Sequence, residues 1–455
     1  MAGPLLLRGT VMHVPRDPFR EGGALEAFED GGVLVDAGVV RATGDFGELS
    51  RRHPGAAVDD RSGALILPGL VDAHVHYPQV PAIGAFGMRL LEWLERRALP
   101  EEARYADAGY AAERADAFLR LLAANGTTTA MVFGAHFAPA MDAFFGAAER
   151  SGLRIVAGLT VSDRNLGEAL RTTPERALKQ GLELARRWHG RGRLAYAVTP
   201  RFALSCGEGM LAACRELLAA VPGLYLTSHI NENTEEIAGV RALHPEASDY
   251  LDAYDRFGLV GERSVLAHDV HPSPRELARL AEAGAAVAHC PSSNLTLGSG
   301  LFPLRRHIDA GVRLALGSDV GAGVGFGLFK EALAAHQVQM LRPDGELLDA
   351  ARALYLATGA GARALGLGEL VGDLAPGKQA DLVVVRPPPG STLAELLRFA
   401  GSAEAALSAV LALAREESIE EVLVAGERVH RRGGGTGGSG PGGGPGLDAG
   451  APAGP

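Results

Sequence analysis

The central part of the chain alternates short apolar runs with longer segments in which apolar residues recur every three or four positions. The apolar runs predict strands at 71–76, 127–133, 153–160, 194–199, 224–228, 264–268, 285–289 and 312–318. Helical patterns separate them, for example at 109–124, 174–189 and 273–283, and Gly190 and Gly284 stand where glycine commonly ends a helix. Eight strands alternating with helices predict an α/β fold closed as a (β/α)8 TIM barrel.

The two ends of the chain carry a different pattern. Residues 1–67 contain short alternating segments separated by Gly and Pro, and a similar pattern returns at 371–431. We expect these two parts to build one small β-sandwich domain beside the barrel of residues 68–370. From 432 to 455 the chain is rich in Gly, Pro and Ala, a composition that predicts a disordered tail without a catalytic role.

Composition narrows the classes of partner and compartment. Hydrophobic residues make up 47% of the 455 residues, which is enough for a sizeable core. The net charge of −10 and the absence of a basic cluster argue against a nucleic-acid partner. Without an apolar run near the ~18 residues of a membrane span, or a signal sequence, we expect no membrane association. Three cysteines without a Cys-x-x-Cys pair indicate a reducing compartment, so the cytoplasm is expected.

Metal-binding side chains follow several of the predicted strands. His74 and His76 end the first strand and point the same way, because alternate side chains of a strand share a face. His229 follows the fifth strand and Asp319 the eighth. One strand-end histidine alone is more often structural. Three imidazoles and one carboxylate at one barrel rim instead predict a site for Zn²⁺ or another divalent first-row metal, with one position left for water.

The scarcity of lysine limits this site to one metal ion. A two-metal barrel of this kind would need a carbamylated lysine as a bridging ligand. The lysines of the chain are Lys179, Lys330 and Lys378, and none of them follows a predicted strand. We therefore expect one metal ion per chain.

Two further strand-end residues could move protons. Glu232 lies three residues after His229, and His268 ends the sixth strand. Both are expected to act as acid and base groups beside the metal. The alternative for Glu232 is a solvated loop carboxylate beside Glu235 and Glu236.

Six segments carry a resemblance to a known family. They are ProGlyLeuValAspAlaHisValHisTyrProGln (68–79), LeuLeuGluTrpLeuGlu (90–95), ValThrProArgPhe (198–202), HisIleAsnGluAsn (229–233), HisCysProSerSerAsnLeuThrLeuGlySerGlyLeuPhe (289–302) and GlySerAspVal (317–320). Together they resemble the amidohydrolase superfamily. HisTyrProGln, LeuLeuGluTrpLeu and ThrProArgPhe are similar to its guanine deaminase branch.

The resemblance implies an activity and a role for each matching residue. It implies a homodimeric enzyme that deaminates guanine to xanthine and ammonia, with one zinc ion bound by His74, His76, His229 and Asp319. It implies that Glu232, His268 and Asp319 are catalytic, and that the purine meets His76, Gln79, Arg201, Phe202, His229, His268 and Asp319. The side chains suit these roles, since Gln79 offers a donor and an acceptor, Arg201 offers donors for guanine O6, and Phe202 offers a face for stacking.

Other functions stay open at this point. The same residues could act on another ring, such as 8-oxoguanine, an adenosine-type substrate, cytosine or a triazine. A non-catalytic metal-binding scaffold is a remote alternative, because the four ligands and Glu232 are all present. Asp269 stands where we would expect Gly, and residues 134–137, which include the unassigned His136, depart from the family pattern. The cytidine-deaminase type of zinc site is excluded because it needs a Cys-x-x-Cys pair, and Cys290 is expected to pack in the core.

Overall fold

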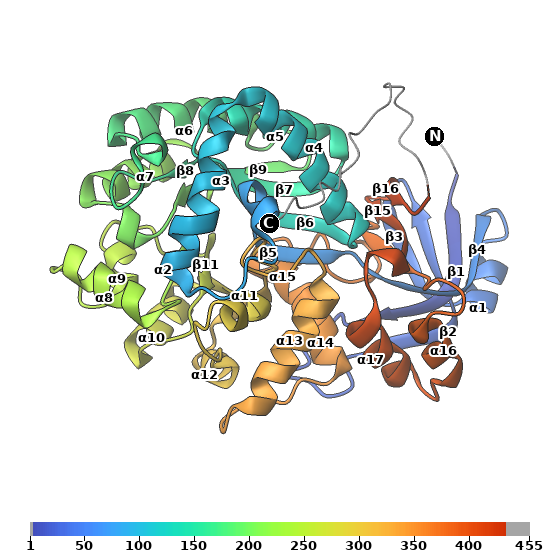
Figure 1. Ribbon diagram of the computed structural model, residues 1–455. Helices are drawn as coiled ribbons and strands as arrows, with labels where there is room; N and C mark the ends of the chain where they lie inside the picture. Colours follow the sequence, from blue (N-terminus) through green and yellow to red (C-terminus); the bar gives the residue numbers. More distant parts are fainter. Residues whose placement is uncertain (1–2, 434–455) are drawn as a thin grey trace, which may run out of the picture.

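The computed structural model describes residues 3–433 and contains the expected barrel of parallel strands (Figure 1). Its strands, in spatial and chain order, are β5 (Leu70–His76), β6 (Thr127–Phe133), β7 (Arg154–Gly158), β9 (Leu194–Pro200), β10 (Tyr225–Ile230), β11 (Ser264–His268), β12 (Ala286–His289) and β13 (Arg313–Leu316). The prediction of one continuous strand at 153–160 was wrong. The segment is divided into β7 and the short β8 (Thr160–Val161), which also pairs with β9.

The ring of strands closes beside the predicted metal ligands. The strand ladder runs from β5 to β13, and two backbone hydrogen bonds join the first strand to the segment after the last. Asp319 N donates to His74 O at 2.9 Å, and His76 N donates to Val320 O at 3.1 Å. The closure therefore fixes the backbone of three predicted ligands relative to one another.

Helices cover the outside of the barrel and follow the sequence pattern closely. The larger ones are α4 (Ala108–Ala124), α5 (Ala138–Ser151), α6 (Pro174–Trp188), α7 (Glu208–Ala220), α8 (Thr234–Leu243), α10 (Pro274–Ala283), α13 (Leu328–Leu341) and α14 (Ala350–Ala357). Helix α10 shows why the pattern is reliable. Ser273 and Glu276 form a capping box at its start, and Gly284 ends it with a left-handed backbone at φ 63°.

Shorter helices complete the loops between the strands. They are α9 (Tyr250–Asp255), α11 (Pro291–Thr296), α12 (Leu304–Ala310) and α15 (Gly359–Ala364). Between β5 and α4 lie a 3-10 turn (Tyr77–Ala82), α2 (Leu90–Trp93), a π-helical turn (Leu94–Ala98) and α3 (Leu99–Ala103). In Figure 1 the blue α2 and α3 run across the front of the barrel. This segment carries a large part of the site described below.

The two ends of the chain build one small sheet domain, as expected. Its strands are β1 (Leu5–His13), β2 (Glu26–Asp36), β3 (Val39–Asp45), β4 (Ala57–Pro68), β14 (Leu382–Val385), β15 (Ile419–Val424) and β16 (Glu427–Arg431), in the order β16-β15-β14-β4-β1-β2-β3. The antiparallel pair of β4 and β14 joins the two ends. Side chains from both halves, such as Val33 and Leu382, share one apolar cluster, so the two ends of the chain have a common core on one seven-stranded sheet.

Three helices flank this sheet, namely α1 (Phe46–Arg52), α16 (Thr392–Phe399) and α17 (Ala403–Leu413).

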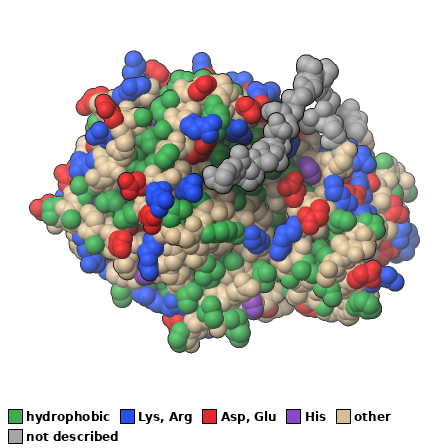
Figure 2. Space-filling view, viewed as in Figure 1, with side chains coloured by type: hydrophobic (Ala, Val, Ile, Leu, Met, Phe, Trp, Pro, Cys, Tyr) green, Lys and Arg blue, Asp and Glu red, His purple; other side chains and the backbone are tan. Residues whose placement is uncertain are grey.

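Positive and negative side chains are interspersed over the face drawn in Figure 2. Among the described helices, none is both long and apolar enough to cross a bilayer. Except for Arg432 and Gly433, the predicted tail at 432–455 lies outside the described residues.

Candidate active site

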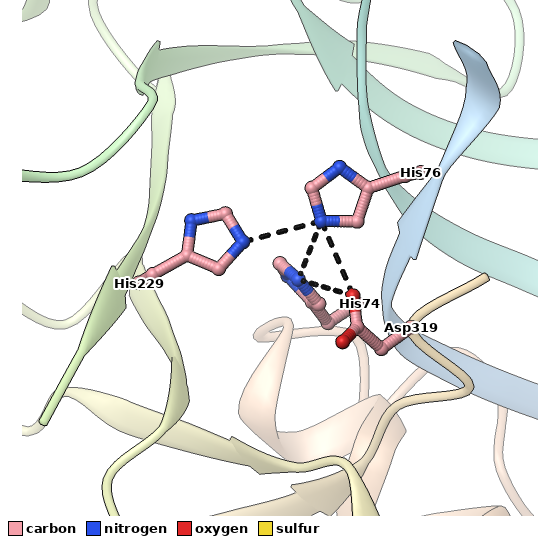
Figure 3. Close-up of side chains that lie close together, drawn as sticks. All are labelled: His74, His76, His229 and Asp319. Carbon is pink, nitrogen blue, oxygen red and sulfur yellow. Dashed lines mark hydrogen bonds and ion pairs between the residues drawn. The ribbon is translucent and has the colours of Figure 1, made fainter. Parts of the chain in front are cut away.

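Three imidazoles and one carboxylate converge at the carboxyl ends of the strands (Figure 3). The His76 Nε2 atom lies 3.1 Å from His74 Nε2 and 3.2 Å from His229 Nε2. The Asp319 Oδ1 atom lies 3.3 Å from His74 Nε2 and 3.2 Å from His76 Nε2. All four side chains are buried. The structure therefore brings together the four residues that the sequence predicted as metal ligands.

The spacing and the protonation of these groups fit a divalent metal. A tetrahedral ion with bonds of about 2.0–2.1 Å holds neighbouring ligand atoms ~3.3 Å apart, close to the distances between these atoms. Burial lowers the pKa of all three histidines, that of His76 to about 4, so neutral imidazoles face the site at neutral pH. Burial alone would raise the pKa of Asp319, but hydrogen bonds from His74 and His76 bring it well below its usual range.

The orientation of His229 is fixed from behind. Its Nδ1 lies 2.6 Å from the backbone oxygen of Arg201. A carbonyl oxygen can only accept, so Nδ1 carries the proton and Nε2 keeps its lone pair toward the centre of the group. The same short contact ties the metal group to the strand that presents Arg201.

Glu232 and His268 lie side by side at the edge of the metal group. Glu232 is 3% exposed, so it is not the solvated loop carboxylate of the alternative reading. Its Oε2 lies 3.4 Å from His268 Nε2, and Ser299 Oγ donates to its Oε1 at 3.1 Å. Burial, together with the charge of Asp319, raises the pKa of Glu232 to about 8. This carboxyl can therefore both take up and release a proton near neutral pH.

An amide side chain sets the tautomer of His268. Asn294 Oδ1 lies 2.9 Å from His268 Nδ1, so Nδ1–H donates to it and Nε2 faces the site. From there Nε2 is 3.4 Å from Glu232 Oε2 and 3.8 Å from Asp319 Oδ2. Asn294 belongs to a segment that carried the resemblance, but no role could be predicted for it from the residues alone.

The predicted purine contacts line a cavity beside the metal group. Gln79 and Arg201 supply polar groups, and Phe202 supplies an aromatic wall. The remaining apolar lining comes from Leu90, Trp93, Leu94, Leu297 and Ala322. Trp93 belongs to the segment across the front of the barrel and packs in one cluster with Phe202. The cavity thus combines an apolar lining with a few polar groups, as small-molecule sites commonly do.

One residue of the site was missed by the sequence analysis. Glu102, at 2% exposure, accepts hydrogen bonds from Arg201 Nη2 at 2.8 Å and from Gln79 Nε2 at 2.7 Å. Its second oxygen lies 3.1 Å from His136 Nε2. Burial alone would raise the pKa of Glu102, but Arg201 and His136 outweigh it and hold the carboxyl ionised. The previously unassigned His136 therefore belongs to the polar network behind the pocket.

The unexpected Asp269 faces away from the metal group. Its backbone is left-handed at φ 45°, a conformation that glycine adopts most easily, which explains the expectation of Gly. Its carboxylate accepts from Asn231 Nδ2 and lies 2.9 Å from His307 Nε2 in a fully buried network. The departure therefore concerns packing behind the rim and not the substrate pocket.

Cys290 and the lysines also have defined surroundings. The Cys290 thiol lies near His268 and Asp319 in a second group of possible ligands. Burial raises its pKa well above the usual value, so it stays protonated, which disfavours metal binding. Lys179 lies in the outer helix α6, and Lys330 donates to the backbone oxygen of Val324 at 2.9 Å.

The chain is similar to proteins of one family over most of its length. Residues 65–429 match the Amidohydrolase family. A probable guanine deaminase of Deinococcus radiodurans is 54% identical over 94% of this chain and 99% of its own length. The guanine deaminase of Escherichia coli K12 is 40% identical over 94% of this chain and 98% of its own.

A solved structure extends the similarity to the fold. The guanine deaminase of C. acetobutylicum, described with guanine bound in its active site, superposes with a TM-score of 0.87 at 25% identity. The superposition covers 94% of this chain and 100% of the other. Fold, site geometry and sequence therefore agree. The chain belongs to the amidohydrolase family, in its guanine deaminase branch.

Proposed function

We propose that this protein is a zinc-dependent enzyme that deaminates guanine to xanthine and ammonia. The proposal rests on one cavity that is lined both by Arg201 and Gln79 and by three of the four metal-binding residues, His76, His229 and Asp319, with Phe202 and Trp93 among its apolar lining. The similarity to guanine deaminases over nearly the whole chain supports the same reaction.

The metal ion would be held by His74, His76, His229 and Asp319, one ion per chain. When bound, zinc supplies Lewis-acid activation that lowers the pKa of water from about 16 to about 7. Three neutral imidazoles and one carboxylate suit zinc among the divalent metals. Lys179 lies in the outer helix α6, Lys330 donates to the backbone oxygen of Val324 and Lys378 pairs with Asp373, so each lysine is placed elsewhere, which supports a single ion.

Arg201, Gln79 and Phe202 would bind and orient the purine. The guanidinium of Arg201 offers fixed donors to O6, and the amide of Gln79 offers both a donor and an acceptor to the ring edge. Phe202 offers an aromatic face to the base. Adenine has an amino group in place of O6, so it would leave a buried donor of Arg201 unpaired and should bind poorly.

Glu232 would move the proton that the reaction requires. Water attacks C2, so a C–O bond forms there, and Glu232 takes the proton of the water and delivers it to a ring nitrogen. The hydroxyl group now on C2 then gives its proton, through Glu232, to the exocyclic amino group. The C2–N bond breaks, ammonia leaves with the bonding electrons, and C2 becomes a carbonyl carbon. His268, aligned by Asn294, and Asp319 would stabilise the tetrahedral carbon centre through their positions beside Glu232.

We further infer a cytoplasmic homodimer. All three cysteines are free and buried, which supports a reducing compartment. Large apolar side chains are exposed at the end of α13 and in the loop after it, where Met340, Leu341 and Leu347 are each more than half exposed. Such a group of exposed apolar residues is typical of an interface and supports a second copy of the chain as the partner.

The proposed reaction is tested by a panel of ring substrates. The zinc-loaded protein should release ammonia from guanine with a kcat/KM at least about 100-fold above that for adenine, cytosine, 8-oxoguanine or an aminotriazine. Ammonia release from one of the other rings, with none from guanine, would show that this other ring and not guanine is the substrate.

A further inference from the structure

A buried ion pair lies directly behind the purine pocket. Glu102 comes from α3, Arg201 from the end of β9 and Gln79 from the turn after β5, so three separate elements meet at one carboxylate. The side chains of Glu102 and Arg201 are each 3% exposed. Arg201 and Gln79 line the cavity, whereas Glu102 does not. Glu102 can therefore affect a ligand only through the residues that it holds.

The carboxylate fixes which part of the Arg201 guanidinium faces the pocket. Nη2 donates to Glu102 Oε1 at 2.8 Å, and Nε donates to Oε2 at 3.3 Å. A paired contact of this kind holds the plane of the guanidinium as well as its position. The remaining nitrogen, Nη1, is left to donate to a ligand. A carbonyl oxygen of the base is the group that such a donor recognises.

The same carboxylate sets the direction of the Gln79 amide. Gln79 Nε2 donates to Glu102 Oε1 at 2.7 Å, and Gly321 N donates to Gln79 Oε1 at 3.3 Å. The two contacts hold opposite ends of the amide, so the amide cannot flip without losing both. Gln79 Nε2 also lies 3.2 Å from His76 Nδ1, but its shorter contact is with Glu102. One carboxylate thus accepts from both residues that present polar groups to the ring.

His136 completes the network from a fourth element. Its side chain is 2% exposed, and its Nε2 lies 3.1 Å from Glu102 Oε2. The oxygen that accepts the weaker bond from Arg201 Nε therefore has a second partner, and the carboxylate has contacts on both oxygens. These contacts hold Glu102 in one position.

We propose that Glu102 is a positioning residue that makes the pocket selective for a purine with an oxygen at C6. It does so by holding the Arg201 guanidinium and the Gln79 amide in the orientation that matches this edge of the base. The inference rests on the proposed guanine deaminase activity. It adds to that activity a residue that does not touch the substrate.

The test compares Glu102→Gln with the parent enzyme on guanine and on 2-aminopurine, which has the same amino group at C2 but no oxygen at C6. We expect kcat/KM for guanine to fall by about 10- to 100-fold, mainly through KM. For 2-aminopurine the fall should be less than about threefold. Glu101→Gln is the matched control, because Glu101 is the neighbouring carboxylate and contacts Arg104 and Tyr110 instead of the pocket network.

The outcomes separate this inference from the proposed function. An equal loss on both substrates would overturn the positioning role and leave a structural one. A parent enzyme that releases no ammonia from guanine would instead overturn the proposed function. If Glu102→Gln does not fold, Glu102→Asp keeps the charge but shortens the reach. Its kcat/KM should then fall more for guanine than for 2-aminopurine, and equal falls for the two substrates would again overturn the proposal.

Discussion

The two halves of the cavity are built in different ways. On the metal side, each ligand sits on or just after a strand, and backbone hydrogen bonds at the barrel closure join His74 and His76 to the segment of Asp319. On the purine side, Arg201 and Gln79 both donate to one side chain, Glu102, and Gln79 has weaker contacts with Gly321 N and His76 Nδ1. The barrel backbone therefore fixes the metal group, whereas the recognition group depends on an ion pair. Substitutions on the metal side and on the purine side should therefore differ in which property they change as well as in the size of the effect.

The largest effect is expected on the metal side. His229→Ala removes a ligand whose Nε2 faces the group, so both metal content and turnover should be lost, with kcat down by more than about 10⁴-fold. Metal analysis and ammonia release measure this. His53→Ala, at a distant position of the small domain, is the control. A His229→Ala enzyme that binds no metal but keeps its turnover would show that the metal group is not required for the reaction, and would contradict its assignment as the catalytic half of the cavity.

The next effect concerns the proton and should leave the metal in place. Glu232→Gln keeps the size and the hydrogen bond from Ser299 but cannot carry a proton. We expect kcat to fall by about 10²- to 10⁴-fold, with metal content unchanged and KM altered little. Glu235→Gln, at an exposed neighbour, should be near normal. Full activity of Glu232→Gln would remove Glu232 from the proton transfer.

A smaller effect is expected on the purine side. Arg201→Lys keeps a positive charge beside Glu102 but loses the planar fork. KM for guanine should rise by about 10- to 100-fold, whereas metal content stays unchanged and kcat falls less. Steady-state kinetics with guanine separate the two constants. A fall in kcat with an unchanged KM would contradict a role in binding the base.

The smallest effect on activity is expected from a buried carboxyl behind the metal side. Glu331 accepts hydrogen bonds from Ser292 N at 3.0 Å and from Ser292 Oγ at 2.7 Å, and burial raises its pKa from 4.5 to about 8. The folded state therefore binds its proton more tightly than the unfolded state does. Its contribution to stability is full below about pH 4.5 and is lost as the pH rises through about 8.

Glu331→Gln should remove this pH dependence. Between pH 5 and pH 8.5, the free energy of unfolding should fall less for Glu331→Gln than for the parent, by an amount on the order of 1 kcal/mol or more. Turnover at pH 7 should change less than about twofold. Denaturant titrations at the two pH values measure the difference. If the free energy of unfolding falls equally with pH in both proteins, the Glu331 carboxyl is not the source of the pH dependence.

The sequence revealed the metal side more completely than the purine side. His74 and His76 could be predicted because both the strand and the alternation of side chains are local features of the chain. Glu102 could not, since it stands beside Glu101 on a short helix and nothing in the sequence distinguishes the two carboxylates. Its partner Arg201 is 99 positions away, and only the folded chain brings them together.

Backbone conformation limited the prediction in two other places. The sequence marked Asp269 as unusual but could not show that its left-handed backbone turns the carboxylate toward His307. The strand predicted at 153–160 is interrupted after Gly158, where a Cβ would meet the backbone oxygen of Ala197. Both features depend on contacts between neighbouring strands. The periodicity of the sequence does not reveal such contacts.

The most direct test of a single catalytic zinc ion is a zinc titration of the metal-free protein with guanine as substrate. We expect no ammonia release from the chelated protein, and a release rate that rises with added zinc and levels off at one ion per chain. Full activity without metal, or a rate that levels off only at two ions per chain, would contradict it.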